Sequence, residues 1–357
     1  MMISQKILVR VCMALFLLSP TLTTKAGAAG GHGEKFEPGY FILDHIGDAY
    51  DGHLFDWKGK QFSVPLPVIL YSKQHGFNVF LSSKFHHGHS AHAGFHIAME
   101  GDHRGKIVET LADGSVARPM LDLSITKMVF ALFVSVAVIL WVFLTVAKAY
   151  TTRGMKAPKG LQSLIEPLML FVRDDIARPA IGYKYRQFMP YLLTVFFFIL
   201  INNLMGLIPI FPFGANVTGN IAITMVLALA TFTIIMASST KTYWGHIFNT
   251  PGVPWWLKIP LPLMPFIELL GVFTKPFVLM MRLFANVTAG HIIILAFISL
   301  IFIFGEMSVG LGFGSSILSV LFIIFMSFIE LLVAFIQAYV FTLLSAIYFG
   351  MAVEEHH

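Results

Sequence analysis

The chain has 357 residues, of which 57% are hydrophobic and only 12% are charged, and its mean hydropathy is +0.77. This composition indicates a protein that crosses a lipid bilayer several times and excludes an ordinary water-soluble domain. The formal net charge of +5 comes from basic residues that gather in loops, which indicates membrane topology rather than binding to nucleic acid.

Residues 1–30 have the pattern of a secretory signal peptide. Lys6 and Arg10 precede a short apolar stretch, and Ala26-Gly27-Ala28 forms a cleavage site. The apolar stretch is too short to serve as a stable membrane anchor. Cleavage would remove Cys12, the only cysteine, so we expect neither disulfides nor cysteine-ligated metal in the mature chain.

Residues 31–120 are polar and are predicted to form a small extracytoplasmic, histidine-rich segment with some β-structure. Apolar and polar residues alternate at 61–64 and 78–81, which predicts short strands there. Ten of the fourteen histidines lie in this segment, and five of them cluster: His86, His87, His89, His92 and His96. Because no acidic or thiolate neighbours stand at fixed spacing, we expect a solvated loop and predict no metal site.

Five apolar stretches predict membrane helices, and with the N-terminal segment they indicate an all-α polytopic membrane protein. They lie at about 126–147, 189–210, 217–237, 266–304 and 317–350. The basic loops that follow the first and third spans are predicted to be cytoplasmic, which puts the N-terminus outside and the C-terminus inside. Apolar residues at helical spacing predict an amphipathic helix at about 160–176 on the cytoplasmic membrane surface.

The last two spans are too long to stand upright in a bilayer. At 1.5 Å per residue they measure roughly 58 and 50 Å, against a hydrocarbon core of about 30 Å. We therefore expect a strongly tilted antiparallel hairpin that turns in the glycine-rich stretch 305–314. This register places His291 level with Glu330, and Arg282 within two residues of level with Gln337.

Arg282 is the most informative residue, because it lies in the middle of the fourth span. A charge at that depth costs about 2.5–3.5 kcal/mol, and arginine cannot escape the cost by losing its proton. An arginine in such a place is a functional hypothesis by default. At 100° per residue, Glu268 and Asn286 share the face of Arg282, whereas His291 lies on the opposite side of the helix.

The run from Met281 to His291 resembles the a subunit of F-type ATP synthases. The resemblance includes Glu268 upstream, Glu330 and Gln337 downstream, and the stretch 203–209, and it covers most of residues 125–355. Many bacterial members carry glutamate where His291 stands and histidine where Glu330 stands. The exchange seen here, as in mitochondrial relatives, indicates that the two side chains work as a pair.

The resemblance implies a proton-translocating stator subunit in a bacterial inner membrane, with no cofactor and no catalytic activity of its own. Its implied partners are a ring of c subunits that carry carboxylates, peripheral-stalk b subunits and, indirectly, the catalytic head. Arg282 would be the charge gate that faces the ring. His291, Glu330, Asn286 and Gln337 would form the periplasmic proton entry, and Glu268 would line the cytoplasmic exit.

Other interpretations stay open at this point. The chain could be a metal/proton antiporter that traps metal with its histidines, or an assembly scaffold that would tolerate Arg282→Gln. His291 and Glu330 could form only a structural bond between helices, and the amides and Glu268 could be ordinary contact or solvated residues. Lys275 and Tyr348 are interpreted as snorkelling and interface residues. Proton or sodium specificity and the role of residues 31–120 are not determined by the sequence.

Overall fold

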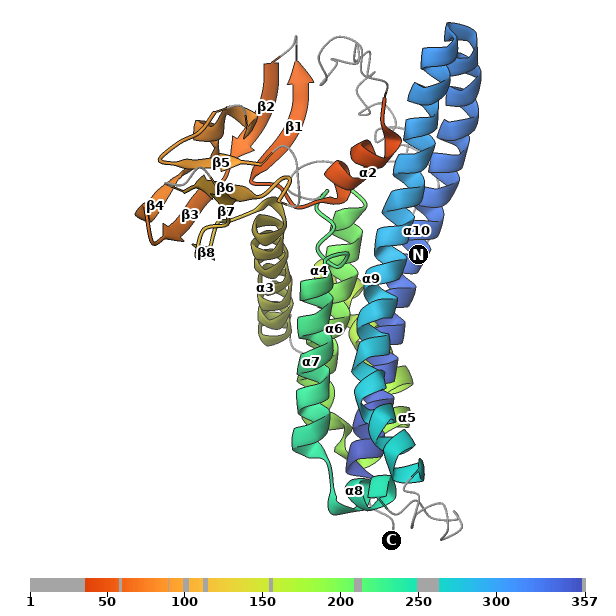
Figure 1. The fold of residues 1–357 in the computed structure, drawn as a ribbon. Coiled ribbons are helices and arrows are strands. Elements are labelled where there is room, and N and C mark those ends of the chain that lie inside the picture. The colour runs from red at the N-terminus through yellow and green to blue at the C-terminus, as the bar shows by residue number, and fades with distance from the viewer. Residues whose placement is uncertain are drawn as a thin grey trace.

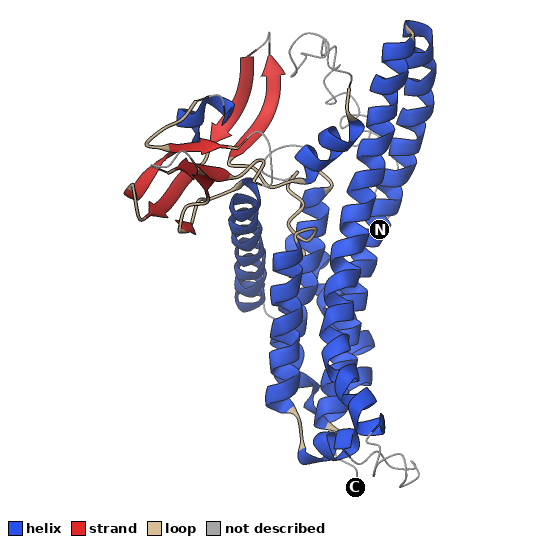
Figure 2. Cartoon of the chain, viewed as in Figure 1, coloured by secondary structure: helices blue, strands red, loops and turns tan. Residues whose placement is uncertain are grey.

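The structure, a computed structural model, describes residues 36–57, 60–88, 90–98, 103–111, 115–153, 157–208, 214–248 and 263–354. A small β-rich part sits at one end of a bundle of long helices (Figures 1 and 2). The predicted signal peptide lies outside the described residues.

The β-rich part contains helix α2 (Pro38–Ile46), the 3-10 helix η1 (Ser82–Gly88) and short antiparallel strands. The strands are β1 (Asp51–Trp57), β2 (Lys60–Pro65), β3 (Pro67–Ser72), β4 (Gly76–Leu81), β5 (Phe95–Ile97), β6 (Ile107–Thr110), β7 (Val116–Ala117) and β8 (Leu121–Asp122). They form one two-stranded sheet, β1-β2, and two three-stranded sheets, β4-β3-β8 and β5-β6-β7. The strands predicted at 61–64 and 78–81 are confirmed as parts of β2 and β4.

Alternation along β3 builds a small core. Val68 and Leu70 point inward and are fully buried, and they pack with Phe85, Phe95 and Ile107 from the neighbouring elements. The β-rich part therefore has a hydrophobic core of its own, separate from that of the helical bundle.

Backbone hydrogen bonds join the β-rich part to the first long helix, α3 (Lys127–Arg153). The backbone N–H of Lys127 donates to the carbonyl of Ala49 at 2.8 Å, and that of Met128 donates to Oδ1 of Asp48 at 3.1 Å. These bonds satisfy amides at the start of α3 that have no partner inside the helix. The β-rich part is thus attached directly to the end of α3.

The prediction of five membrane-crossing segments is confirmed, because five helical segments among the described residues are long and apolar enough to span a bilayer. They contain α3, α6 (Tyr185–Gly206), α7 (Ile221–Ser238), α9 (Leu263–Met307) and α10 (Val309–Val353). A short helix, α8 (Lys241–Phe248), follows α7.

The second of these segments begins earlier than predicted, at Leu161. It consists of α4 (Leu161–Phe171), a π-helix η2 (Val172–Ala177), α5 (Arg178–Ile181), the 3-10 turn η3 (Gly182–Lys184) and α6. In the stretch 160–176, predicted as an amphipathic surface helix, Val172 and Ile176 are fully buried and the ring of Phe171 lies 5.6 Å from that of Tyr339. Its position at the membrane surface stays a prediction. The apolar side of this segment is covered by α6 and α10, which is why it is amphipathic.

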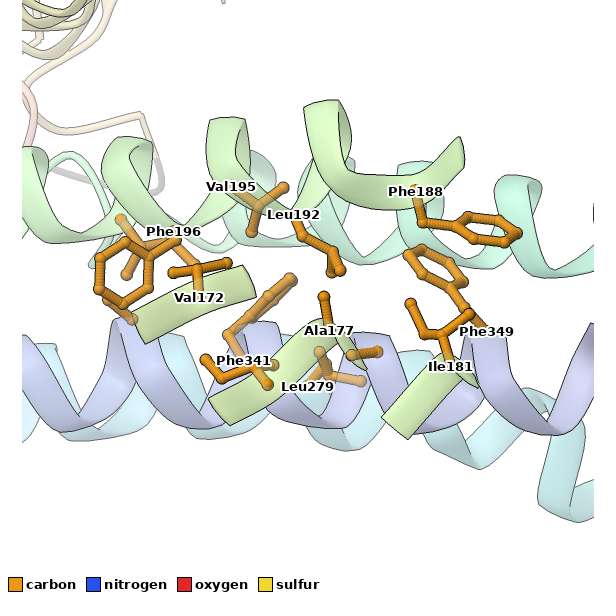
Figure 3. Close-up of a cluster of buried hydrophobic side chains, with 14 of the residues drawn as sticks. Val172, Ala177, Ile181, Phe188, Leu192, Val195, Phe196, Leu279, Phe341 and Phe349 are labelled. Atoms are coloured by element: carbon orange, nitrogen blue, oxygen red, sulfur yellow. The ribbon is translucent and has the colours of Figure 1, made fainter. Parts of the chain in front are cut away.

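The core of the bundle forms where this π-helical segment meets the long helices (Figure 3). The rings of Phe188 and Phe349 stack with centroids 4.8 Å apart. A Cβ at Gly350 would overlap the carbonyl oxygen of Ala180, so a glycine is needed where α10 passes α5. Further side chains of this cluster are Val172, Ala177, Ile181, Leu192, Val195, Phe196, Leu279 and Phe341.

The predicted antiparallel C-terminal hairpin is confirmed, but its turn differs from the expectation. The chain reverses at Ser308 alone, whose side chain accepts a hydrogen bond of 3.2 Å from the backbone of Leu311. This N-cap starts α10 at once, so the later glycines of 305–314 are helical. They permit close approach instead: a Cβ on Gly312 would lie 2.9 Å from the Cα of Gly305. Each helix has 45 residues, or about 68 Å, which fits the expected tilt.

Candidate functional site

His291 of α9 and Glu330 of α10 lie side by side, as the predicted register requires. Nδ1 of His291 is 3.6 Å from Oε1 of Glu330, and it also donates to the carbonyl of Val287 at 3.2 Å. The separation from the carboxylate is longer than a hydrogen bond, and among the described residues Oε1 has no hydrogen-bond partner. A buried carboxylate oxygen without a partner is suited to hold a proton or a bridging water.

Gly290 makes room for this carboxylate. An ideal Cβ at Gly290 would lie 2.5 Å from Oε1 of Glu330 and 3.1 Å from its Cγ. Both distances are shorter than an ordinary van der Waals contact, so a side chain at this position would push Glu330 away. The glycine immediately before the histidine is therefore part of the site.

Polar residues of α6 and of the loop before α7 extend the site. Thr218 donates to the amide oxygen of Asn203 at 2.5 Å, and the amide nitrogen of Asn203 donates to the carbonyl of Ala334 at 3.3 Å. Nearby, Oδ1 of Asn202 and Nδ2 of Asn216 are buried and lack a partner within the described part of the chain. In the sequence, Asn203 was notable only as part of the stretch 203–209 that carries the family resemblance. Two adjacent asparagines at the end of an apolar helix are the signal that could have marked this polar cluster.

Arg282 lies nine residues before His291, about 13 Å along α9. Its neighbours Leu279 and Leu283 are buried, whereas Arg282 and Asn286 are exposed. Arg282 therefore faces outward from the bundle, on a different side of α9 from His291, as the helical phase predicts. Within the described ranges no carboxylate forms an ion pair with this guanidinium.

Gln337 is buried in α10. Two contacts between α9 and α10 fix the register of the hairpin: His291 with Glu330, and Lys275 with Tyr348. Arg282 and Gln337 lie between these contacts, within about one helical turn of each other along the hairpin. The two residues are thus near the same level, which agrees with the predicted register.

A second polar group lies on the other side of Arg282, toward the C-terminal end of the bundle. Nζ of Lys275 is 5.4 Å from the centroid of the Tyr348 ring. The Tyr348 hydroxyl is also close enough to Arg282 for the charge of the guanidinium to act on it. Glu268 is in the electrostatic range of both Lys275 and Tyr243 of α8. Burial raises the pKa of the Tyr243 hydroxyl, and the charge of Glu268 adds to this shift. The sequence predicts that Lys275 snorkels and that Tyr348 is an interface residue, and the structure brings these two side chains together, with Tyr348 close enough for the charge of Arg282 to act on it.

The clustered histidines of the β-rich part fall on different elements. His86 and His87 lie in η1 and His96 in β5, while His89 is outside the described residues. In the part of the chain that the structure describes, no group of three or more His, Cys, Asp or Glu side chains is placed to hold a metal ion.

The fold and site together define a class: a polytopic membrane protein with an acid–imidazole pair between its last two helices and an exposed arginine within the fourth span. Residues 128–350 match the family described as ATP synthase A chain, which is more than half of the sequence. The chain therefore belongs to the ATP synthase subunit a family. Residues 41–123 match a separate domain family of unknown function.

Individual relatives agree with this assignment. ATP synthase subunit a of Chloroherpeton thalassium is 41% identical over 244 residues, covering 66% of this chain and 69% of the relative. ATP synthase subunit a 2 of Chlorobaculum tepidum is 46% identical over 239 residues, covering 65% and 64%. ATP synthase subunit a of an Anaeromyxobacter strain is 35% identical over 343 residues, which covers 93% of this chain and 74% of the relative.

Proposed function

We propose that this chain is the proton-translocating stator subunit of an ATP synthase membrane sector and that it supplies two half-channels to the carboxylates of a rotating c-ring. The family assignment supports the general role. The observation that carries the mechanism is Arg282, a permanent charge on the outward side of a membrane helix with no carboxylate partner among the described residues. A carboxylate supplied by another subunit would provide the missing ion-pair partner of Arg282.

Arg282 acts as the charge gate in this mechanism. A ring carboxylate that passes the guanidinium is held in its ionised form, because a nearby opposite charge favours ionisation. When the carboxylate leaves the arginine for lipid it must take up a proton, since an unpaired charge there is too costly. The ring therefore turns only as protons are delivered and removed, and the fixed positive charge prevents protons from passing directly between the channels.

His291 and Glu330 form the entry half-channel together with Asn286 and Gln337. The His291–Glu330 pair lies level with the end of α6 and the start of α7, because a Cβ at Gly206 would lie 4.0 Å from Nε2 of His291 and Thr288 donates to the carbonyl of Gly219 at 3.4 Å. The β-rich part lies toward this end of α6 and α7 (Figure 1). If the predicted signal peptide exports that part, this end is periplasmic. A proton would then reach Glu330 or His291 first and move toward the level of Arg282.

Glu268 lines the exit half-channel on the opposite side of Arg282. The contact between Lys275 and Tyr348 supports their inclusion on this side, because both lie between Glu268 and the arginine in the hairpin. The C-terminus lies at this end of the bundle and is cytoplasmic in the proposed orientation (Figure 1). Peripheral-stalk b subunits would hold the chain against the ring in a bacterial inner membrane, and the catalytic head would make the ATP.

The test is ATP synthesis in membrane vesicles under an imposed proton gradient. We expect Arg282→Gln to abolish synthesis while the complex still assembles, because glutamine cannot hold the ring carboxylate ionised. The control is Lys241→Gln, which removes an exposed cation of α8 and should leave synthesis unchanged. Synthesis retained in Arg282→Gln would remove the arginine from the mechanism and favour a scaffold.

A further inference from the structure

The sheet β4-β3-β8 has one face in the core of the β-rich part and one that nothing in the described chain covers. Alternation puts Val68 and Leu70 on the buried face. The opposite face, called here the outer sheet face, consists of exposed large apolar residues. They are Tyr71, Phe77, Val79, Leu81, Leu121 and Leu123.

These residues form one continuous patch. Tyr71 of β3 is paired with Phe77 of β4 on one side and with Leu121 of β8 on the other, and Val79 is paired with Ile69. Residues paired across adjacent strands on one face have Cβ atoms about 4.5–5.5 Å apart. Phe77 is 68% exposed and Val79 58% exposed. A continuous apolar surface of this kind marks a site that is covered in the working molecule.

The outer sheet face is joined rigidly to the first membrane helix. After β8 the chain continues along β3, with the backbone of Leu123 donating to Ile69 at 2.9 Å and that of Ile125 donating to Pro67 at 3.0 Å. Helix α3 begins two residues later, at Lys127. Lys127, the first residue of α3, is four positions after Leu123, a distance of at most about 14 Å.

The apolar surface also continues along α3. Leu123 is 65% exposed, and on α3 the side chains of Phe133, Leu140 and Leu144 are exposed in the same way. Because α3 is long and apolar enough to cross a membrane, its exposed apolar side chains are suited to face lipid. The sheet lies beside the end of α3 at which the helix begins, away from the α9–α10 pair (Figure 1).

We propose that the outer sheet face rests on the bilayer, with its apolar side chains in the boundary between the headgroups and the acyl chains of the outer leaflet. The exposed cation Lys73 directly follows β3, two residues after Tyr71, where it would meet lipid phosphates. The β-rich part is then a membrane-seated module that fixes α3 at its point of entry. This proposal depends on α3 crossing the membrane and is independent of the proton mechanism.

The test measures the depth of single fluorescent probes on the full chain in vesicles of phosphatidylcholine and phosphatidylglycerol. Cys12→Ser removes the native thiol, and Val79→Cys places the probe on the outer sheet face. The matched control is Lys84→Cys, an exposed residue of η1. Its neighbour Phe85 packs on the core side of the sheet, with its ring centroid 5.2 Å from that of Phe80, so the control lies on the far side of the domain.

We expect lipids with a spin label near the headgroup to quench the probe at position 79 several-fold more than the probe at position 84, and aqueous iodide to show the reverse order. Equal quenching by iodide at both positions would overturn the proposal, because the face would then be in water. Protection of position 79 from both quenchers would also overturn it and would point to a protein or a second copy on this face. A probe at Leu121→Cys must repeat the result obtained at position 79.

Discussion

Gly290 offers a way to disturb the acid–imidazole pair without changing either member of it. In Gly290→Ala the new Cβ would lie 2.5 Å from Oε1 of Glu330, whereas an ordinary contact begins at 3.4 Å, so the oxygen must retreat by about 0.9 Å. The Cγ atom, at 3.1 Å, must also give way. Glu330 therefore cannot keep its place beside His291, from which it is already separated by 3.6 Å.

The size of the effect follows from two opposing contributions. Alanine favours a helix over glycine by about 1 kcal/mol, and overpacking costs about 1–3 kcal/mol, so the folded chain should change little in stability. Proton transfer is far more sensitive, because a misplacement of about 1 Å can lower a rate by up to 100-fold. We expect Gly290→Ala to lower ATP-driven proton pumping roughly tenfold at normal assembly.

The assay is quenching of a pH-sensitive dye in inverted vesicles, with the amount of assembled complex measured in parallel. The control is Gly271→Ala on the same helix, where a Cβ meets nothing within 4 Å. It carries the same gain in helix propensity and should pump normally. Equal pumping by the two variants would refute the idea that the position of the Glu330 carboxylate controls proton entry.

Other consequences of the structure can be tested in the same vesicles. His291→Glu and Glu330→His should each lower pumping strongly, and the double exchange should restore much of it, because an acid again faces an imidazole; a double variant no better than the singles would contradict the pairing. Gly350→Ala should reduce the amount of assembled chain, because a Cβ there overlaps the Ala180 carbonyl, whereas Gly310→Ala, with open space around it, should not. Tyr50→Phe should destabilise the β-rich part by about 1 kcal/mol through loss of the 2.6 Å hydrogen bond to Asp122, seen as faster limited proteolysis. Burial, together with the hydrogen bond to Asp122, raises the pKa of Tyr50 above its ordinary value of 10.0. The protonated hydroxyl should therefore stabilise the β-rich part fully below pH 10.0, and this stabilisation should be lost as the pH rises above that value. An unchanged proteolysis profile between about pH 9 and 12 would contradict this.

The sequence predicted the long elements well because hydropathy over about 20 residues depends little on context. The pairing of His291 with Glu330 was also predictable, since the register of an antiparallel hairpin follows from where it turns. The turn lies within the predicted stretch 305–314 but is shorter than expected, because the glycines near 312 serve close helix contact and Ser308 alone caps α10.

Interactions between distant segments were less predictable. The contact between Lys275 and Tyr348 joins residues that are far apart in the chain, and each has a common explanation when it is considered alone. The π-helix at Val172 depends on the packing of α6 and α10 around it, which local propensity does not encode. The outer sheet face appeared only as ordinary alternation at 78–81, because the sequence does not say which side of a strand is covered.

The most direct test of the central claim is passive proton conductance of vesicles whose catalytic heads have been removed, measured beside ATP synthesis in intact vesicles for Arg282→Gln. If the arginine separates two half-channels, Arg282→Gln loses ATP synthesis while its passive proton conductance is kept or rises above that of the native chain. Without the fixed positive charge, ring carboxylates can carry protons between the half-channels without the ring being forced to turn. Synthesis at the native rate with unchanged conductance would contradict the account.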